Sequence, residues 1–131
     1  MLAVWEHSKH RKRLVKAAGV VRINLVCAPA TWDEVRRRCT ARYGQLHFPQ
    51  EASASDVDGL VHVELEGPHL VRLLEETRWG TSAWSLSGVA GRAVFRRVYE
   101  AAADVVDEID LTADQGKPIR DIVLDARRGP E

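Results

Sequence analysis

The residues of this chain best suited to bind a ligand are the basic side chains near its start. Ten positions from His7 contain five lysines and arginines, namely Lys9, Arg11, Lys12, Arg13 and Lys16. Such a cluster can neutralise several nucleic-acid phosphates together. No aromatic side chain is interleaved within it, which weakens a model of base stacking on single strands. A solvated helix surface or a loose basic tail is the alternative interpretation.

A second basic group lies in a predicted helix over Thr31–Tyr43 and comprises Arg36, Arg37, Arg38 and Arg42. Consecutive helical residues point in different directions, so the three adjacent arginines cannot all contact one ligand. Both a solvated helix face and a contribution to an anion-binding face remain open for this group.

Residues suited to catalysis or metal binding do not form a recognisable set in the sequence. His62 and His69 have no identifiable nucleophile or carboxylate partner. The segment 110–121 alternates oxygen ligands as a calcium loop does, but its glycine is one residue late and Asp121 stands where a bidentate Glu belongs. Cys27 and Cys39 lack zinc-ligand spacing and are interpreted as reduced, buried residues. We therefore expect no catalytic residues, metal or cofactor.

Two tryptophans stand out in the segment 79–91, which contains no charged residue between Trp79 and Gly91. Large aromatic side chains are unusual in a flexible linker, so Trp79 and Trp84 are expected to be anchored. The anchor is either the core of this chain or a partner protein, in which case the two residues are binding hot spots.

The segment Gly59–Trp79 indicates what kind of fold positions these residues. Val61, Val63 and Leu65 alternate with polar residues, which predicts a strand with one apolar face. After Gly67-Pro68, apolar residues recur at helical spacing, and proline suits a first helical position. A strand that leads into a helix through a two-residue break is typical of a layered fold of helices on a sheet.

The same periodicities predict the remaining elements. Thr31 and Glu34 form a capping box that would begin the first helix of the core, whereas Gln50–Asp58 is interpreted as a loop. The predicted strands are Gly19–Ala28, Gln45–Phe48, Gly59–Glu66 and Ile119–Leu124. The predicted helices are Thr31–Tyr43, Pro68–Arg78 and Ala90–Ile109.

These elements predict an α+β fold in the form of a two-layer α/β sandwich. Three to four mostly antiparallel strands would be covered on one face by three helices, like a ferredoxin-like plait with an added helix. Residues 1–18 would form a basic N-terminal segment, residues 19–126 a single domain and residues 127–131 a C-terminal tail. Neither a membrane span nor a signal peptide is apparent, and the interpretation of the cysteines favours a cytoplasmic protein.

Charge is distributed unevenly, although the chain carries no net charge. Residues 1–42 contain ten lysines and arginines against three aspartates and glutamates, and the rest of the chain is acidic. The helix Ala90–Ile109 is basic at its start and acidic at its end, which opposes the helix dipole. The basic N-terminal part is the obvious candidate to offset that acidic end. Separate basic and acidic partner surfaces are the alternative.

Two functional hypotheses follow. The first is a non-catalytic protein-interaction or regulatory module that self-associates through its long C-terminal helix, with Trp79, Trp84, Phe95, Val98 and Val106 as partner-binding residues. The second is a nucleic-acid-binding accessory protein that uses the basic N-terminal segment and the arginine face of residues 36–42. The overall neutrality of the chain counts against the second hypothesis.

Overall fold

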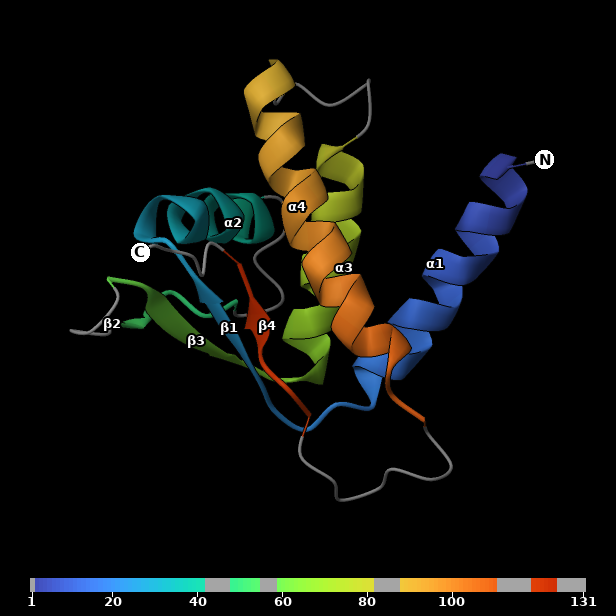
Figure 1. Ribbon diagram of the computed structural model, residues 1–131, viewed down its shortest axis with the longest axis horizontal. Helices are drawn as coiled ribbons and strands as arrows, with labels where there is room; N and C mark the ends of the chain where they lie inside the picture. Colours follow the sequence, from blue (N-terminus) through green and yellow to red (C-terminus); the bar gives the residue numbers. More distant parts are fainter. Residues whose placement is uncertain (1, 42–47, 55–58, 82–87, 111–118, 125–131) are drawn as a thin grey trace, which may run out of the picture.

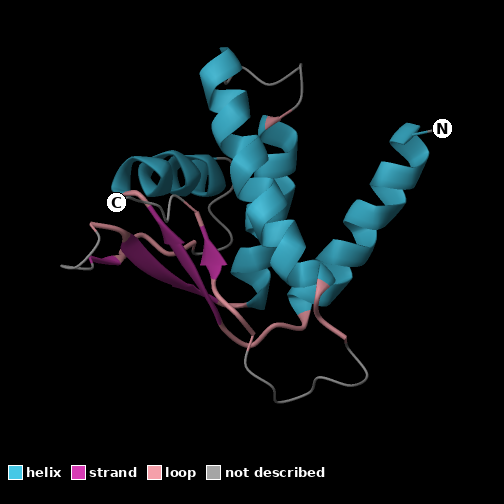
Figure 2. Cartoon of the chain, viewed as in Figure 1, coloured by secondary structure: helices cyan, strands magenta, loops and turns pink. Residues whose placement is uncertain are grey.

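The computed structural model describes residues 2–41, 48–54, 59–81, 88–110 and 119–124 (Figure 1). It is a small α+β domain with a mixed sheet. The elements in these residues are α1 (Leu2–Ala18), β1 (Ile23–Cys27), α2 (Pro29–Ala41), β2 (Ser53–Ala54), β3 (Val61–Leu65), α3 (Gly67–Gly80), α4 (Gly88–Asp107) and β4 (Ile122–Val123). In Figure 2 the strands lie together at one side of the molecule, and α1 diverges from the body with its N-terminus far from the sheet.

The sheet is built around β1, which lies between β3 and β4 in the order β2-β3-β1-β4. Its register pairs Leu25 with Val63 on antiparallel β3 and with Ile122 on parallel β4. All three side chains are fully buried. Val26, on the opposite face of β1, is buried as well, which agrees with the central position that its apolar character predicts.

The parallel pairing of β4 distinguishes this sheet from the expected plait. Two helices, α3 and α4, follow each other between β3 and β4. Each helix of an antiparallel pair reverses the chain direction, so a second helix brings the chain back to the end at which β3 finished. β4 then runs antiparallel to β3 and parallel to β1. The order of the elements from β1 onward agrees with the prediction. Two of the three strand pairings are antiparallel, as expected, and the parallel pairing of β4 makes the sheet a mixed one.

The change of period at Gly67-Pro68 is confirmed: β3 ends at Leu65 and α3 begins at Gly67. Gly67 also allows a close approach, because a Cβ there would lie 2.7 Å from the carbonyl oxygens of both Ala18 and Val20. The start of α3 therefore packs directly against the end of α1 and the segment that follows it.

Two local predictions were wrong. The helix α2 begins at Pro29, so Thr31 lies inside it and does not cap it. Proline is favoured at a first helical position, and the Ala28 carbonyl accepts the first helical hydrogen bond, from Trp32 N–H at 3.0 Å.

The second wrong prediction concerns the strand beside β3. Ser53–Ala54, in the segment interpreted as a loop, forms β2 and pairs with His62 and Val61. Of the predicted strand Gln45–Phe48, only Phe48 is among the described residues; it is buried and lies outside any strand.

The core joins the inner face of the sheet to the facing sides of the helices. Cys27, Val35, Leu74 and Val98 are among its fully buried members. Both cysteines are reduced and buried, as predicted. None of the helices in the described residues combines the length and apolar character needed to cross a membrane.

Candidate anion-binding site

Four basic residues of α1 line one surface hollow at the junction of α1 and α4. Its volume is about 490 Å³, and its lining residues are Ser8, Lys9, Lys12, Arg13, Lys16 and Asp107. Lys9, Lys12 and Lys16 follow one another at spacings of three and four residues, which places them on one side of the helix. Helix formation thus gathers four of the five residues in the basic cluster. Arg11 is exposed and does not line the hollow.

Asp107, the last residue of α4, contributes the only carboxylate among the lining residues. Arg13 donates two parallel hydrogen bonds to it, from Nε to Oδ1 and from Nη2 to Oδ2, each 2.9 Å long. Lys16 Nζ donates to the Asp107 backbone oxygen at 3.4 Å. Cations therefore surround the negative end of the α4 dipole. The predicted match between the basic N-terminal part and the acidic end of this helix is confirmed.

The pairing shifts the titration of both partners. The hydrogen bond from Arg13 holds the pKa of the Asp107 carboxyl below its usual range, although partial burial acts in the opposite direction. The hydrogen bond to Asp107 raises the pKa of Arg13. Both groups therefore stay ionised at neutral pH, and the hollow combines four cationic side chains with one carboxylate.

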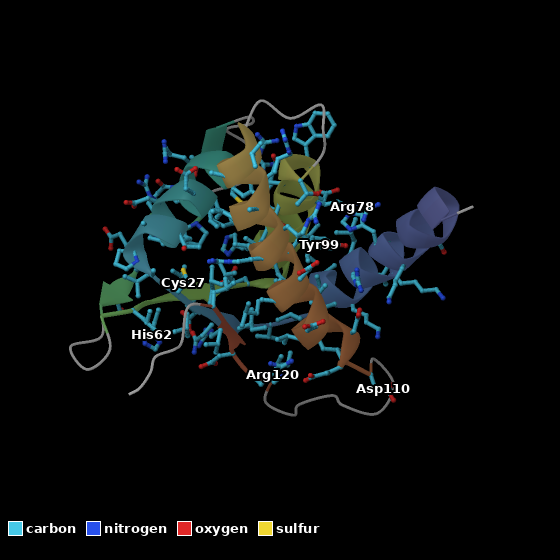
Figure 3. All side chains as sticks on the ribbon, turned by 45° about the horizontal axis from the view of Figure 1, so that its top comes forward. Cys27, His62, Arg78, Tyr99, Asp110 and Arg120 are labelled. Atoms are coloured by element: carbon cyan, nitrogen blue, oxygen red, sulfur yellow. The ribbon has the colours of Figure 1, made fainter. Side chains whose placement is uncertain are left out.

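A buried polar contact holds α1 in place beside the hollow. His10 is almost fully buried, and its Nδ1 forms a 2.8 Å hydrogen bond with the hydroxyl of Tyr99 on α4. Arg13 Nη1 also donates to that hydroxyl, at 3.2 Å. Tyr99 lies between α4 and α1 (Figure 3). His10 and Tyr99 cannot be recognised from the sequence, because a contact between residues 89 positions apart leaves no local pattern.

The arginines of α2 lie elsewhere and do not extend this site. Arg36 is 3.5 Å from Asp33 and Arg37 is 2.6 Å from Glu34, so both form ion pairs within their own helix. Neither lines the hollow. Arg42 lies outside the described residues.

Arg38 turns inward instead and belongs to a buried ionic cluster. Its Nε is 3.4 Å from Glu76 Oε1, and Arg72 Nε is 3.9 Å from Glu76 Oε2. Arg72 Nε also donates to the Cys39 carbonyl at 3.0 Å, which ties α3 to α2. Burial raises the pKa of the Cys39 thiol, so this sulfur stays protonated.

The side chains predicted to bind a protein partner through α4 are buried in this chain. Phe95 is 4% exposed, and Val98 and Val106 are fully buried. The apolar stripe of α4 packs on the other elements and offers no contact surface, so self-association through these residues is not supported. Trp79 is 43% exposed, and Trp84 lies outside the described residues.

His62 and His69 lie within secondary-structure elements, and His69 takes part in the hydrogen bonding of a helix start. His69 Nδ1 accepts a hydrogen bond at 3.0 Å from the backbone N–H of Glu66, which caps the start of α3. His62 lies on β3, opposite Val26 and Ser53. Across the described part of the chain, no group of three or more His, Cys, Asp or Glu residues is arranged to hold a metal ion.

Comparison with protein-family models, curated proteins and solved structures gives no match to this chain.

Proposed function

We propose that this chain is a nucleic-acid-binding accessory protein that presents the hollow on α1 to backbone phosphates. The observation that carries the proposal is the convergence of Lys9, Lys12, Arg13 and Lys16 on one hollow that contains a single carboxylate. Ammonium and guanidinium groups bind phosphate oxygens through charge-assisted hydrogen bonds.

The dimensions of α1 support contact with more than one phosphate. Lys9 and Lys16 are seven residues apart, which corresponds to roughly 10 Å along a helix. Phosphates on one strand of a duplex are spaced by about 3.4 Å along the helix axis, so three lysines span several of them. Contacts to phosphate oxygens carry no sequence information, so this contact is expected to be independent of sequence.

A salt titration with matched variants tests the proposal. Binding of a labelled 20-base-pair DNA is measured by fluorescence anisotropy between 50 and 200 mM NaCl. We expect an affinity in the range of about 10⁻⁴–10⁻⁶ M that falls steeply with salt. Replacement of Lys9, Lys12 and Lys16 together by Gln should remove up to about 2.7 from the slope of log K against log salt.

The control variant removes the same charge from other positions. Arg11, Arg22 and Arg37 are exposed, and none of them lines the hollow. Their joint replacement by Gln should weaken binding far less than the triple lysine variant does. Equal losses in the two variants would show that general charge, and not this hollow, governs binding.

A protein-interaction or regulatory module is the second candidate function, and the exposure of Trp79 favours it. Trp79, in the last turn of α3, has 43% of its surface accessible, and Val89 at the start of α4 is 78% exposed. Exposed aromatic residues are typical of binding hot spots. Light scattering after size-exclusion chromatography tests self-association. A dimer that Trp79→Ala dissociates supports this function. A strict monomer excludes self-association as the interaction.

The cytoplasmic location expected from the cysteines remains part of the proposal. Cys27 and Cys39 are both fully buried and are thiols, not members of a disulfide. Free thiols are typical of a reducing compartment.

A further inference from the structure

We propose that Asp107 is an internal competitor for phosphate: its carboxylate occupies the Arg13 guanidinium in the absence of ligand and yields it to a phosphate group of the nucleic acid. This inference rests on the proposed function of the α1 hollow. It assigns Arg13 as a phosphate-binding residue and Asp107 as the group that limits its availability.

The geometry of the pair supports the exchange. Arg13 meets the two carboxylate oxygens of Asp107 through two parallel hydrogen bonds of 2.9 Å. A phosphate presents two oxygens to a guanidinium in the same bidentate manner. Because Asp107 and the lysines line one hollow, a phosphate bound by the lysines lies beside the pair.

The exposure of Asp107 lowers the free-energy cost of releasing its carboxylate from Arg13. Its side chain is 38% exposed, so the released carboxylate can be solvated with little rearrangement. A phosphate at the hollow would therefore replace a carboxylate that water can solvate.

Arg13 remains positioned after the exchange. Its Nη1 donates to the Tyr99 hydroxyl, and its guanidinium lies 5.7 Å from the centre of the Tyr99 ring. Its side chain is only 15% exposed. These contacts do not involve Asp107, so the guanidinium keeps its orientation when the carboxylate leaves.

The variant Asp107→Asn tests the inference, with Glu108→Gln as its matched control. Glu108 is the next residue and also forms a bidentate ion pair, with Arg120 at 2.7 and 2.6 Å, but it does not line the hollow. In the DNA titration, Asp107→Asn should bind roughly threefold to tenfold more tightly, with a slope steeper by about 0.9, which corresponds to one more phosphate contact. Glu108→Gln removes the same charge and should give a clearly smaller gain.

A double variant isolates the role of Arg13. The gain from Asp107→Asn should disappear in the Arg13→Gln background, because no guanidinium is then released. Equal gains from Asp107→Asn and Glu108→Gln, or a gain that persists without Arg13, would overturn the inference. If the triple lysine variant loses binding while Asp107→Asn gains none, the proposed function stands and the competitor role fails.

A second readout does not depend on nucleic acid. The melting temperature is measured in inorganic phosphate and in chloride at equal ionic strength. Phosphate should stabilise Asp107→Asn more than it stabilises the unaltered chain, because its Arg13 is no longer occupied. The same phosphate stabilisation in both proteins would contradict the competition between carboxylate and phosphate.

Discussion

The contact between Gly80 and Phe95 gives a sharp test of the packing of α3 against α4. A Cβ added at Gly80 would lie 2.5 Å from Phe95 Cδ2, 2.8 Å from Cγ and 3.1 Å from Cβ. Favourable carbon–carbon contacts lie at about 3.5–4.0 Å, so the overlap is about 1 Å. Rotation of the ring cannot relieve it, because the Cβ of Phe95 is also too close. Gly80→Ala therefore requires the two helices to separate.

The expected energies follow from this geometry. Overpacking of this kind costs about 1–3 kcal/mol, and the gain in helix propensity from glycine to alanine offsets less than about 1 kcal/mol of it. Phe95→Ala removes a buried ring and should cost about 3–5 kcal/mol. Without the Phe95 ring, the methyl group that Gly80→Ala introduces no longer overlaps with the ring atoms. The double variant should therefore be about 1–3 kcal/mol more stable than the sum of the single effects.

Urea unfolding followed by circular dichroism measures this coupling. Phe95→Leu serves as a milder partner if Phe95→Ala is too unstable to fold. Gly88→Ala is the control, since its φ of +78° makes a side chain strained, but among the described residues no side chain or neighbouring element lies within 4 Å of the added Cβ. It should show no coupling to Phe95. Additive effects of Gly80→Ala and Phe95→Ala would show that the Phe95 ring does not pack against Gly80 and would refute this packing of α3 on α4.

Three further predictions concern packing, pH and thiol reactivity. Gly67→Ala should lower stability by about 1–3 kcal/mol, because its Cβ would meet two backbone carbonyls that cannot rotate away; an unchanged denaturation midpoint would contradict the close approach. The lowered pKa of Asp107 means that its pairing stabilises the fold at neutral pH and is lost as the pH falls below about 4. The stability difference from Asp107→Asn, under about 1 kcal/mol because the carboxylate is partly exposed, should therefore shrink in acid, and a difference that grows there would oppose this assignment. Cys39 should resist iodoacetamide at pH 8 until the chain unfolds, because its thiol is buried and its pKa is raised; rapid native-state alkylation, detected by mass spectrometry, would place this thiol at the surface.

Local periodicity was enough to predict most of the elements. The alternation of Val61, Val63 and Leu65 predicts β3, and Gly67-Pro68 marks the start of α3. The apolar stripe of α4 was also recognised. Periodicity shows that a stripe must be covered, but it does not show whether the cover comes from the same chain. For this reason Phe95, Val98 and Val106 were assigned to a partner, whereas they are buried in the core.

The candidate site could be predicted only in part. The sequence identifies the basic cluster, and helical geometry places Arg11 on a different side of α1 from the three lysines. Its place in the fold depends on contacts between distant residues: Arg13 and Asp107 are 94 positions apart. Charge asymmetry indicated such a match in general terms. It did not reveal His10 or Tyr99, because buried polar pairs arise from tertiary packing and not from local spacing.

The most direct test of the central claim is the salt dependence of DNA binding by the unaltered chain and by the variant with Lys9, Lys12 and Lys16 replaced by Gln. The account predicts a linear fall of log K with log salt, and a slope reduced by up to about 2.7 in the variant. It also predicts a much smaller change when Arg11, Arg22 and Arg37 are replaced. Binding that is absent at 50 mM salt, or a slope that the lysine replacements leave unchanged, would contradict it.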